Sequence, residues 1–175
     1  GVGTAPAEPR PAPQVSVRPP SLCPGCPHRA TQFAARTVFG ADGLYFNDIG
    51  CYTLGFGPPL NTADALLCMG AGFTLADGVS RMTGKRPLGF LGDSTFYHSG
   101  MAPLLNAIKG NANLVAVILD NHVTAMTGFQ PSPGVELVSD VLSRAAPIES
   151  LVRALGATHL QTVDPYDLAQ TIAAF

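Results

Sequence analysis

The chain has 175 residues, of which 46% are apolar and 13% are charged, and its formal net charge is −2. This length is enough for one domain with a buried core, and the near-neutral charge predicts no nucleic acid and no membrane as a partner. No apolar run approaches the roughly 18 residues that cross a bilayer, and no signal peptide precedes the domain, so we expect a cytoplasmic protein. Soluble domains usually carry about one quarter charged residues, so this composition predicts either extensive contact with other protein or a piece of a longer chain.

Proline dominates the start of the chain. Residues 1–20 contain six prolines and few large apolar residues, a composition that cannot form a core and predicts an extended linker. We therefore expect a linker at 1–20 and one domain at 21–175. A linker at the very start, and a last helical pattern without a cap, both indicate a fragment of a longer polypeptide.

Helical and strand patterns alternate along the domain. Apolar residues at helical spacing predict helices at 28–39, 71–82, 101–109, 148–155 and 165–175. In the first helix, the residues expected on the apolar face are Ala30, Phe33, Ala34 and Val38. Short apolar runs predict strands at 44–48, 88–91, 114–119 and 158–163, with another apolar stretch at 65–69. The run at 114–119 is continuous, which is typical of a strand covered on both faces, and glycine and proline predict a loop at 128–135.

This alternation predicts an α/β fold. Right-handed crossovers between successive strands give a parallel sheet with helices on both faces. Ligands of such sheets bind at the carboxyl ends of the strands. Two polar motifs fall there, Gly92-Asp93-Ser94 and Asp120-Asn121.

The two motifs supply ligands for a magnesium–diphosphate site. Adjacent strand ends can bring Asp93 and Asn121 together, and a carboxylate, an amide oxygen and backbone carbonyls form the oxygen set that Mg²⁺ prefers. The small residues Gly92 and Ser94 would let backbone N–H groups approach a diphosphate. The alternative is that strand-end Asp and Asn residues only cap loops, but the paired motifs favour the metal site.

Five segments extend the pair into a family resemblance. The segments are Cys23-Pro-Gly-Cys26-Pro-His-Arg29, Asp48-Ile-Gly-Cys51-Tyr-Thr-Leu-Gly55, Cys68-Met-Gly70, Gly92-Asp-Ser-Thr-Phe-Tyr-His-Ser-Gly100 and Asp120-Asn-His-Val-Thr-Ala-Met-Thr-Gly128. Together they resemble the alpha subunits of the indolepyruvate:ferredoxin oxidoreductases, a branch of the 2-oxoacid:ferredoxin oxidoreductases. The Gly-Asp-Ser and Asn pair is similar to the thiamine diphosphate signature. The resemblance spans about residues 18–175.

The resemblance implies a thiamine diphosphate-binding fold and a role for each matching residue. Mg²⁺ would be bound by the side chains of Asp93 and Asn121 and by the carbonyl oxygen of Val123. The residues expected to contact the cofactor are Ile49, Gly50, Cys51 and Tyr52 at the thiamine, Gly92, Ser94 and Thr95 at the diphosphate, and Ala125 and Met126 beside them. Met126 would hold the cofactor bent, so that the cofactor can deprotonate itself. The alternative for Met126 is a side chain of the core.

The reaction implied is oxidative decarboxylation of an arylpyruvate such as indolepyruvate to an acyl-CoA. Electrons would pass through iron–sulfur clusters to ferredoxin. The implied partners are a pyrimidine-binding domain or subunit that carries the activating Glu, a gamma- or beta-type partner subunit, ferredoxin and coenzyme A, in an oligomer. We therefore expect the isolated chain to bind the cofactor weakly and not to turn over.

The cysteines leave three alternatives open. Cys23, Cys26 and Cys51 match cluster ligands of related enzymes, but a [4Fe–4S] cluster takes four thiolates, and free thiols near the cofactor are the favoured interpretation. Zinc on Cys23, Cys26 and His28 is a further option. Cys68 adjoins an apolar stretch, which predicts a buried, inert thiol.

His28 and His98 are candidate catalytic residues. Either could bind the substrate carboxylate or shuttle a proton, although a lone histidine is more often structural; His122 is a weaker candidate. Arg29 could pair with a carboxylate or the diphosphate, or be solvated or inter-subunit.

Two other functions remain as alternatives. A non-redox thiamine diphosphate-dependent 2-oxoacid decarboxylase or synthase also has the Asp and Asn pair, but not the Cys-Pro-Gly-Cys or Asp-Ile-Gly-Cys segments. A cofactor-binding module that is inactive on its own is the third hypothesis.

Overall fold

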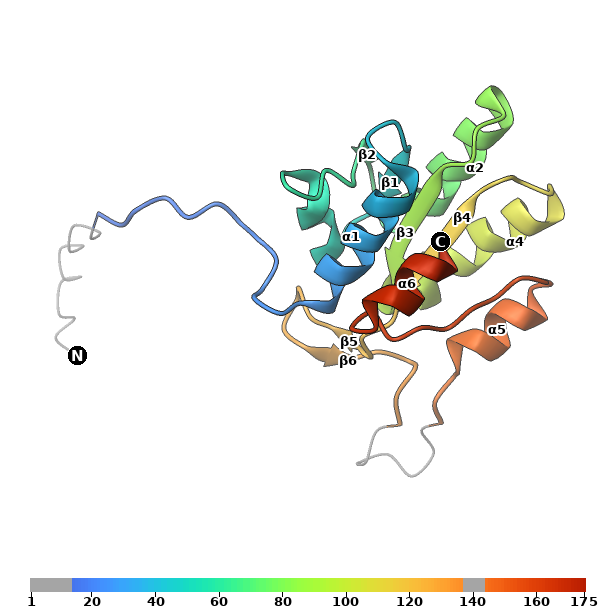
Figure 1. Ribbon diagram of the computed structural model, residues 1–175. Coiled ribbons are helices and arrows are strands. Elements are labelled where there is room, and N and C mark those ends of the chain that lie inside the picture. The colour runs from blue at the N-terminus through green and yellow to red at the C-terminus, as the bar shows by residue number, and fades with distance from the viewer. Residues whose placement is uncertain (1–13, 137–143) are drawn as a thin grey trace, which may run out of the picture.

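The computed structural model describes residues 14–136 and 144–175 (Figure 1). Most of the predicted linker, residues 1–13, lies outside the described residues. Residues 14–20 are exposed and have no regular secondary structure.

Four parallel strands form the central sheet, in the order β2-β1-β3-β4. The strands are β1 (Tyr45–Asn47), β2 (Ala65–Leu66), β3 (Leu88–Gly92) and β4 (Val115–Leu119). β3 pairs with β4 along its whole length, ending with Gly92 opposite Leu119. On its other side, β3 pairs with β1, where Tyr45 lies opposite Leu88. The chain leaves β1 towards one edge of the sheet and β3 towards the other, so the strand order reverses between these two strands.

Helices cover both faces of this sheet (Figure 1). α2 (Ala71–Thr83) connects β2 to β3, and α4 (Met101–Lys109) connects β3 to β4. Both connections run in the same direction, so right-handed crossovers place α2 and α4 on one face, where they pack against each other. α1 (Pro27–Phe39) and α6 (Leu168–Ala174) pack together on the opposite face. α5 (Ile148–Ala154) adds Val152 to the core.

Short elements follow the carboxyl ends of the strands. They are the 3-10 helix η1 (Cys51–Phe56), the helical turn α3 (Asp93–Thr95), the π-helix η2 (Phe96–Gly100) and the antiparallel pair β5 (Val123–Thr124) and β6 (Gln130–Pro131). α3, η2 and α4 follow one another without a break, so one helical run begins directly at Asp93.

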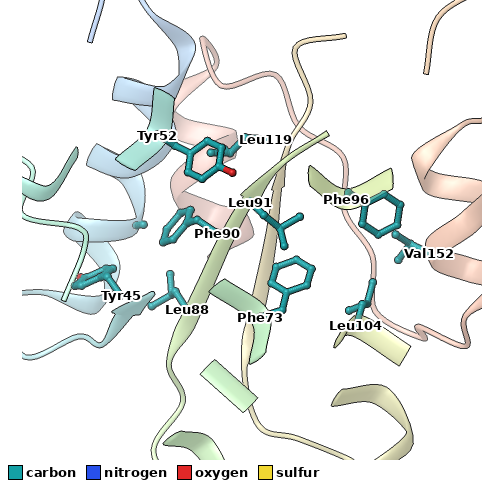
Figure 2. Close-up of a cluster of buried hydrophobic side chains, with 11 residues drawn as sticks. Tyr45, Tyr52, Phe73, Leu88, Phe90, Leu91, Phe96, Leu104, Leu119 and Val152 are labelled. Carbon is teal, nitrogen blue, oxygen red and sulfur yellow. The ribbon is translucent and has the colours of Figure 1, made fainter. Parts of the chain in front are cut away.

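The core lies between the sheet and its helices, and Figure 2 shows its side chains. Large side chains with no exposed surface include Tyr45, Phe73, Phe90 and Phe96. β3 is buried at all five positions, which makes it the central strand in packing as well as in order. Full burial of such side chains contributes about 1.5–3 kcal/mol each, so the core holds the strand ends in fixed positions.

The predicted α/β fold with a parallel sheet is confirmed, and the helices expected at 71–82, 101–109 and 148–155 match α2, α4 and α5. The strand predicted at 158–163 was wrong, as was the expectation that the strand at 114–119 is covered on both faces. Residues 158–163 form no strand, and β4 is therefore an edge strand in the described chain. Only Leu119 of β4 is buried, while Val115, Val117 and Ile118 are partly buried against the core. A continuous apolar run does not distinguish such an edge strand from a central one.

Smaller differences concern helix ends and faces. The last helix begins at Leu168 because the side chain of Asp167 caps it by accepting the N–H of Gln170. The loop expected at 128–135 contains β6. α1 buries Thr31, Gln32, Ala34 and Ala35, whereas Phe33 and Val38 are exposed. The apolar face predicted for α1 was therefore largely wrong, because the helix turns polar and small residues towards η1.

Candidate functional site

The carboxyl ends of β1 and β3 form the candidate site. Asp48 follows β1 and Asp93 follows β3, on either side of the point where the strand order reverses. A crevice at such a point is the usual ligand-binding position of an open parallel sheet. Both carboxylates are buried, Asp48 with no exposed surface and Asp93 with 2%.

Asp93 has a buried oxygen that lacks a partner. Its Oδ2 atom accepts no hydrogen bond from the described residues. Burial raises the pKa of this carboxyl above its usual range, while hydrogen bonds from the Ser132 hydroxyl and the Ser94 N–H act to lower it. A buried carboxylate oxygen without a donor is costly unless a cation or a hydrogen-bond donor binds it. The residue therefore fits a metal ion at this position.

The second predicted ligand lies on the neighbouring loop. Because Gly92 is opposite Leu119 in the sheet, Asp93 and Asp120 follow adjacent strand ends, and the Asp120 carboxylate acts to raise the pKa of Asp93. The Oδ1 atom of Asn121 accepts the N–H of Val123 at 3.2 Å, which closes a tight turn.

The two loops are also joined by a direct contact. The hydroxyls of Ser94 and Thr124 lie 2.5 Å apart and connect α3 to β5. Beyond β5, the side chain of Met126 is 52% exposed, so it is not part of the core. The core alternative for Met126 was therefore wrong.

The residues predicted to line the thiamine, 49–52, follow β1. They lie where the chain passes from the end of that strand into the 3-10 helix η1. Ile49 is 44% exposed, and Gly50 and Cys51 are half-buried. Tyr52 is buried, and its ring lies so close to Gly92 that a side chain there would approach its Cε1 atom to 3.0 Å. Tyr52 therefore joins the ends of β1 and β3, and glycine at position 92 makes room for it.

Asp48 was not among the predicted site residues. Its Oδ2 atom accepts the N–H of Gly70 at 2.7 Å, and its Oδ1 atom accepts the hydroxyl of Tyr52. Burial raises the pKa of Asp48 to about 6, against the lowering effect of these two hydrogen bonds. Burial and the Asp48 carboxylate in turn raise the pKa of Tyr52, so its hydroxyl stays protonated and donates. The sequence signals were its position directly after a strand and its place in the Asp48-Ile-Gly-Cys51 segment, and neither assigned it a role.

Three of the cysteines, Cys23, Cys26 and Cys51, lie near one another. Burial, and then the nearby Cys26 and Cys23, raise the pKa of the Cys51 thiol. Within residues 14–136 and 144–175, no group of three or more His, Cys, Asp or Glu side chains is arranged to hold a metal ion. All four cysteines are free, and Cys68 is exposed, so the prediction that it is buried was wrong. Its neighbours Leu67 and Met69 are exposed as well, because the apolar stretch ends at the surface.

The histidines occupy different environments. His28 is buried, its Nδ1 atom lies 3.1 Å from the Cys26 sulfur, and its ring is 6.0 Å from the ring of Tyr52. Burial lowers the pKa of His28 and so favours the neutral imidazole, whose ring packs at a tilt against Tyr52. His98 is exposed on η2, and His122 contacts Asp120 at 3.1 Å.

Arg29 has a local structural role. Its Nε atom donates to the carbonyl oxygen of Cys23 at 3.0 Å, and its guanidinium also reaches the carbonyl of Leu22. These contacts hold the turn that carries the Cys-Pro-Gly-Cys segment. Neither contact was expected from the sequence.

Comparison with known proteins decides the family. Residues 48–175 match the family described as thiamine pyrophosphate enzyme, C-terminal TPP binding domain. The chain belongs to this family. The resemblance to thiamine diphosphate enzymes is thereby confirmed, and the matched residues include both strand-end carboxylates.

Relatives with closer sequence similarity are subunits of larger enzymes. The chain is 45% identical over 169 residues to the indolepyruvate oxidoreductase subunit IorA of Methanothermobacter marburgensis, covering 91% of the chain and 27% of that protein. It is 44% identical to the subunit of the same name from Thermococcus kodakarensis, covering 90% of the chain and 26% of that protein. The chain thus spans about a quarter of the length of these relatives.

A solved structure supports the fold. The 2-oxoglutarate:ferredoxin oxidoreductase from Magnetococcus marinus superposes with a TM-score of 0.67 at 22% identity, over 91% of this chain and 60% of that chain. In the described part of the chain, no helix has both the length and the apolar character needed to cross a membrane.

Proposed function

We propose that this chain is the diphosphate-side cofactor domain of an enzyme that oxidatively decarboxylates arylpyruvates such as indolepyruvate. Residues 21–175 would form the domain and residues 1–20 a linker. The observation that carries the proposal is the buried, unpaired oxygen of Asp93 at the point where the strand order reverses, within a domain of the thiamine pyrophosphate enzyme family. The cytoplasm is the proposed compartment.

The metal ion would be Mg²⁺, held by Asp93, Asn121 and the carbonyl oxygen of Val123. The donor set supports this assignment, because it consists of oxygen atoms only and Mg²⁺ completes such sets with phosphate and water oxygens. The turn from Asn121 to Val123 presents its backbone beside the strand end that carries Asp93. Loss of the metal would leave Asp93 with the uncompensated oxygen described above.

The remaining site residues would bind and orient the cofactor. Gly92 ends β3, and Ser94 and Thr95 lie at the start of the helical run; all three would contact the diphosphate through backbone N–H groups and hydroxyls. Ile49, Gly50, Cys51 and Tyr52 would lie along the thiamine, with Ala125 and Met126 on the other side. The exposed side chain of Met126 is free to press against a ligand. Thiamine diphosphate, when bound, supplies the electron sink that decarboxylation of a 2-oxoacid requires.

The substrate and partners are proposed from the relatives. Their name specifies indolepyruvate and an oxidoreductase subunit, so we propose indolepyruvate as substrate and a partner subunit. From the resemblance to the 2-oxoacid:ferredoxin oxidoreductases, we further propose a pyrimidine-binding domain, ferredoxin as electron acceptor and coenzyme A as acyl acceptor. His98, exposed on η2, is the candidate for contact with the substrate carboxylate. His28 is buried beneath Tyr52, so we propose that it supports the site from inside.

For the cysteines we propose free thiols near the cofactor. Cys23, Cys26 and Cys51 are close enough to influence one another but are not arranged around a common metal position. A [4Fe–4S] cluster on them is the competing assignment. Iron and zinc analysis of anaerobically purified protein distinguishes free thiols, a cluster and a zinc site, because a cluster would give about four iron atoms per chain and a zinc site about one zinc atom.

The function is tested on the full-length subunit assembled with its partner. Calorimetry with thiamine diphosphate and Mg²⁺ should show binding, and indolepyruvate with coenzyme A should reduce ferredoxin. An Asp93→Asn variant serves as the matched control, because it changes one oxygen to nitrogen at the proposed metal ligand. Release of CO₂ with an aldehyde product and no ferredoxin reduction would indicate the non-redox decarboxylase. Absence of cofactor binding by the assembled wild-type enzyme would indicate an inactive module.

A further inference from the structure

We propose that Asp48 is a positioning residue that fixes three separate segments around the cofactor through hydrogen bonds of its two carboxylate oxygens. The inference rests on the proposed function, since it concerns the same cofactor site. The three segments are the one that follows β1, which carries Tyr52, the one that follows β3, which carries Thr95, and the start of α2 at Gly70.

The first connection runs from Asp48 to α2. Its Oδ2 atom accepts the N–H of Gly70, the residue that precedes the first turn of that helix. Gly70 has a φ of +89°, and a Cβ atom there would lie 2.9 Å from the carbonyl oxygen of Ser99. The position therefore requires glycine, and Asp48 anchors the start of α2 beside the end of η2.

The second connection runs through Tyr52 to β3. The Tyr52 hydroxyl donates to Oδ1 of Asp48 and lies 3.4 Å from Oγ1 of Thr95, in the segment proposed to bind the diphosphate. The backbone of Tyr52 is held separately, because the side chain of Gln32 donates to its carbonyl oxygen at 2.6 Å. Tyr52 is thus fixed at both ends, and Asp48 determines where its hydroxyl lies.

The chemistry of these contacts favours a carboxylate. Gly70 and Tyr52 each present a donor, and a carboxylate accepts from both, whereas the amide of asparagine has only one acceptor. No ion pair of the described residues includes Asp48, so its buried charge is stabilised by the two hydrogen bonds alone. A buried charge without an ion-pair partner is costly to stability, and residues of this kind concentrate at functional sites.

The matched control is Asp77. This second buried carboxylate also uses both oxygens, because it pairs with Arg81 at 2.7 Å and accepts from Asn106 at 2.9 Å. It joins α2 to α4 away from the strand ends. Asp77→Asn therefore perturbs a buried carboxylate on α2 but removes neither of the two hydrogen bonds that Asp48 accepts.

The test compares Asp48→Asn, Tyr52→Phe, their double variant and Asp77→Asn in the assembled full-length enzyme. The measurements are thermal unfolding without cofactor, the Kd for thiamine diphosphate in the presence of Mg²⁺, kcat, and the near-ultraviolet circular dichroism of the bound cofactor. We expect Asp48→Asn and Tyr52→Phe each to raise the Kd about tenfold, as loss of one hydrogen bond to a charged group implies. The double variant should be little worse than either, because both remove the same connection. Asp77→Asn should lower Tm but leave the Kd within about twofold of the wild-type value.

The outcomes separate this inference from the proposed function. If wild-type enzyme binds the cofactor and both site variants bind it equally well with an unchanged dichroism spectrum, Asp48 has only a structural role and the inference fails. If the wild-type enzyme does not bind the cofactor, the proposed function fails and the inference fails with it. Should Asp48→Asn not fold, Tyr52→Phe alone decides, because it retains the carboxylate and removes only its donor.

Discussion

Asp48 and Asp93 occupy equivalent places at the ends of neighbouring strands, yet their surroundings differ. Both oxygens of Asp48 accept hydrogen bonds from within the chain, whereas Asp93 keeps one buried oxygen without a donor. The same residue type can therefore complete the protein's own structure or leave a position for a ligand. For this reason we assign Asp93 to the metal ion and Asp48 to the hydrogen bonds that hold the surrounding segments.

The largest expected effect comes from Asp93. Asp93→Asn should weaken binding of Mg²⁺ and thiamine diphosphate more than about 100-fold, because it removes the charge of a proposed metal ligand. The metal-free protein should keep or slightly raise its free energy of unfolding, since an unpaired buried charge disappears. Calorimetry and chemical unfolding measure the two quantities. If Asp93→Asn lost cofactor binding only because the variant no longer folded, the assignment of Asp93 as a metal ligand would be contradicted.

Asp48 should show the opposite effect on the unliganded fold. Asp48→Ala leaves the N–H of Gly70 and the hydroxyl of Tyr52 buried without their acceptor. We expect the free energy of unfolding to fall by roughly 2 kcal/mol, because each unpaired buried group costs about 1–3 kcal/mol and removal of the buried charge offsets part of this cost. Urea unfolding of the cofactor-free protein measures it. Equal stability of Asp48→Ala and Asp93→Asn would remove the distinction between the two strand ends.

The charge of Asp48 also predicts a pH dependence. Burial raises its pKa in the folded chain to about 6. A carboxyl with a higher pKa in the folded state binds its proton more tightly there, so it stabilises the fold as pH falls through about 6 and this stabilisation is lost as pH rises. Relative to Asp48→Asn, which does not titrate, the wild-type protein should gain about 1 kcal/mol between pH 7 and pH 5. A constant difference across this range would show that Asp48 keeps an ordinary pKa.

The smallest effect should come from the contact between the Asp93 loop and its neighbour. Thr124→Val keeps the shape of the side chain but removes the hydroxyl that meets Ser94. One half-buried hydrogen bond of this kind contributes roughly 0.5 kcal/mol to stability, and cofactor binding should weaken only a few-fold. Ser94→Ala should give a similar stability change, and the double variant no further loss. A full additive loss would show that the two hydroxyls act independently.

Much of the framework followed from local patterns. The helices at 71–82 and 101–109 and the strand at 88–91 have clear apolar periodicity and clear ends, and the structure places them within two residues of prediction. Asp93 and Asn121 could be assigned because a parallel sheet brings consecutive strand ends to one edge. The sheet register that sets Gly92 opposite Leu119 bears out this reasoning.

Other features depended on segments that are distant in sequence. α1 buries Gln32 because the carbonyl of Tyr52 meets it, and no periodicity in the helix reveals that partner. Ser132 reaches Asp93 from beyond β6, and Asp48 reaches Gly70 from the end of β1. In the sequence, a polar residue that follows a strand looks the same whether its side chain caps a loop or hydrogen-bonds to distant segments.

The sequence by itself determined the α/β fold class and the strand-end position of the motifs, and it predicted a magnesium–diphosphate role for Asp93 and Asn121. Hydrophobic periodicity is a local property, so the fold class and the motif positions follow from it, whereas the cofactor was implied by the family resemblance. Only the tertiary structure decided that Asp48 is satisfied by Tyr52 and Gly70 while an oxygen of Asp93 is not. That distinction depends on which donors from separate segments reach each carboxylate, and packing alone brings those donors into place.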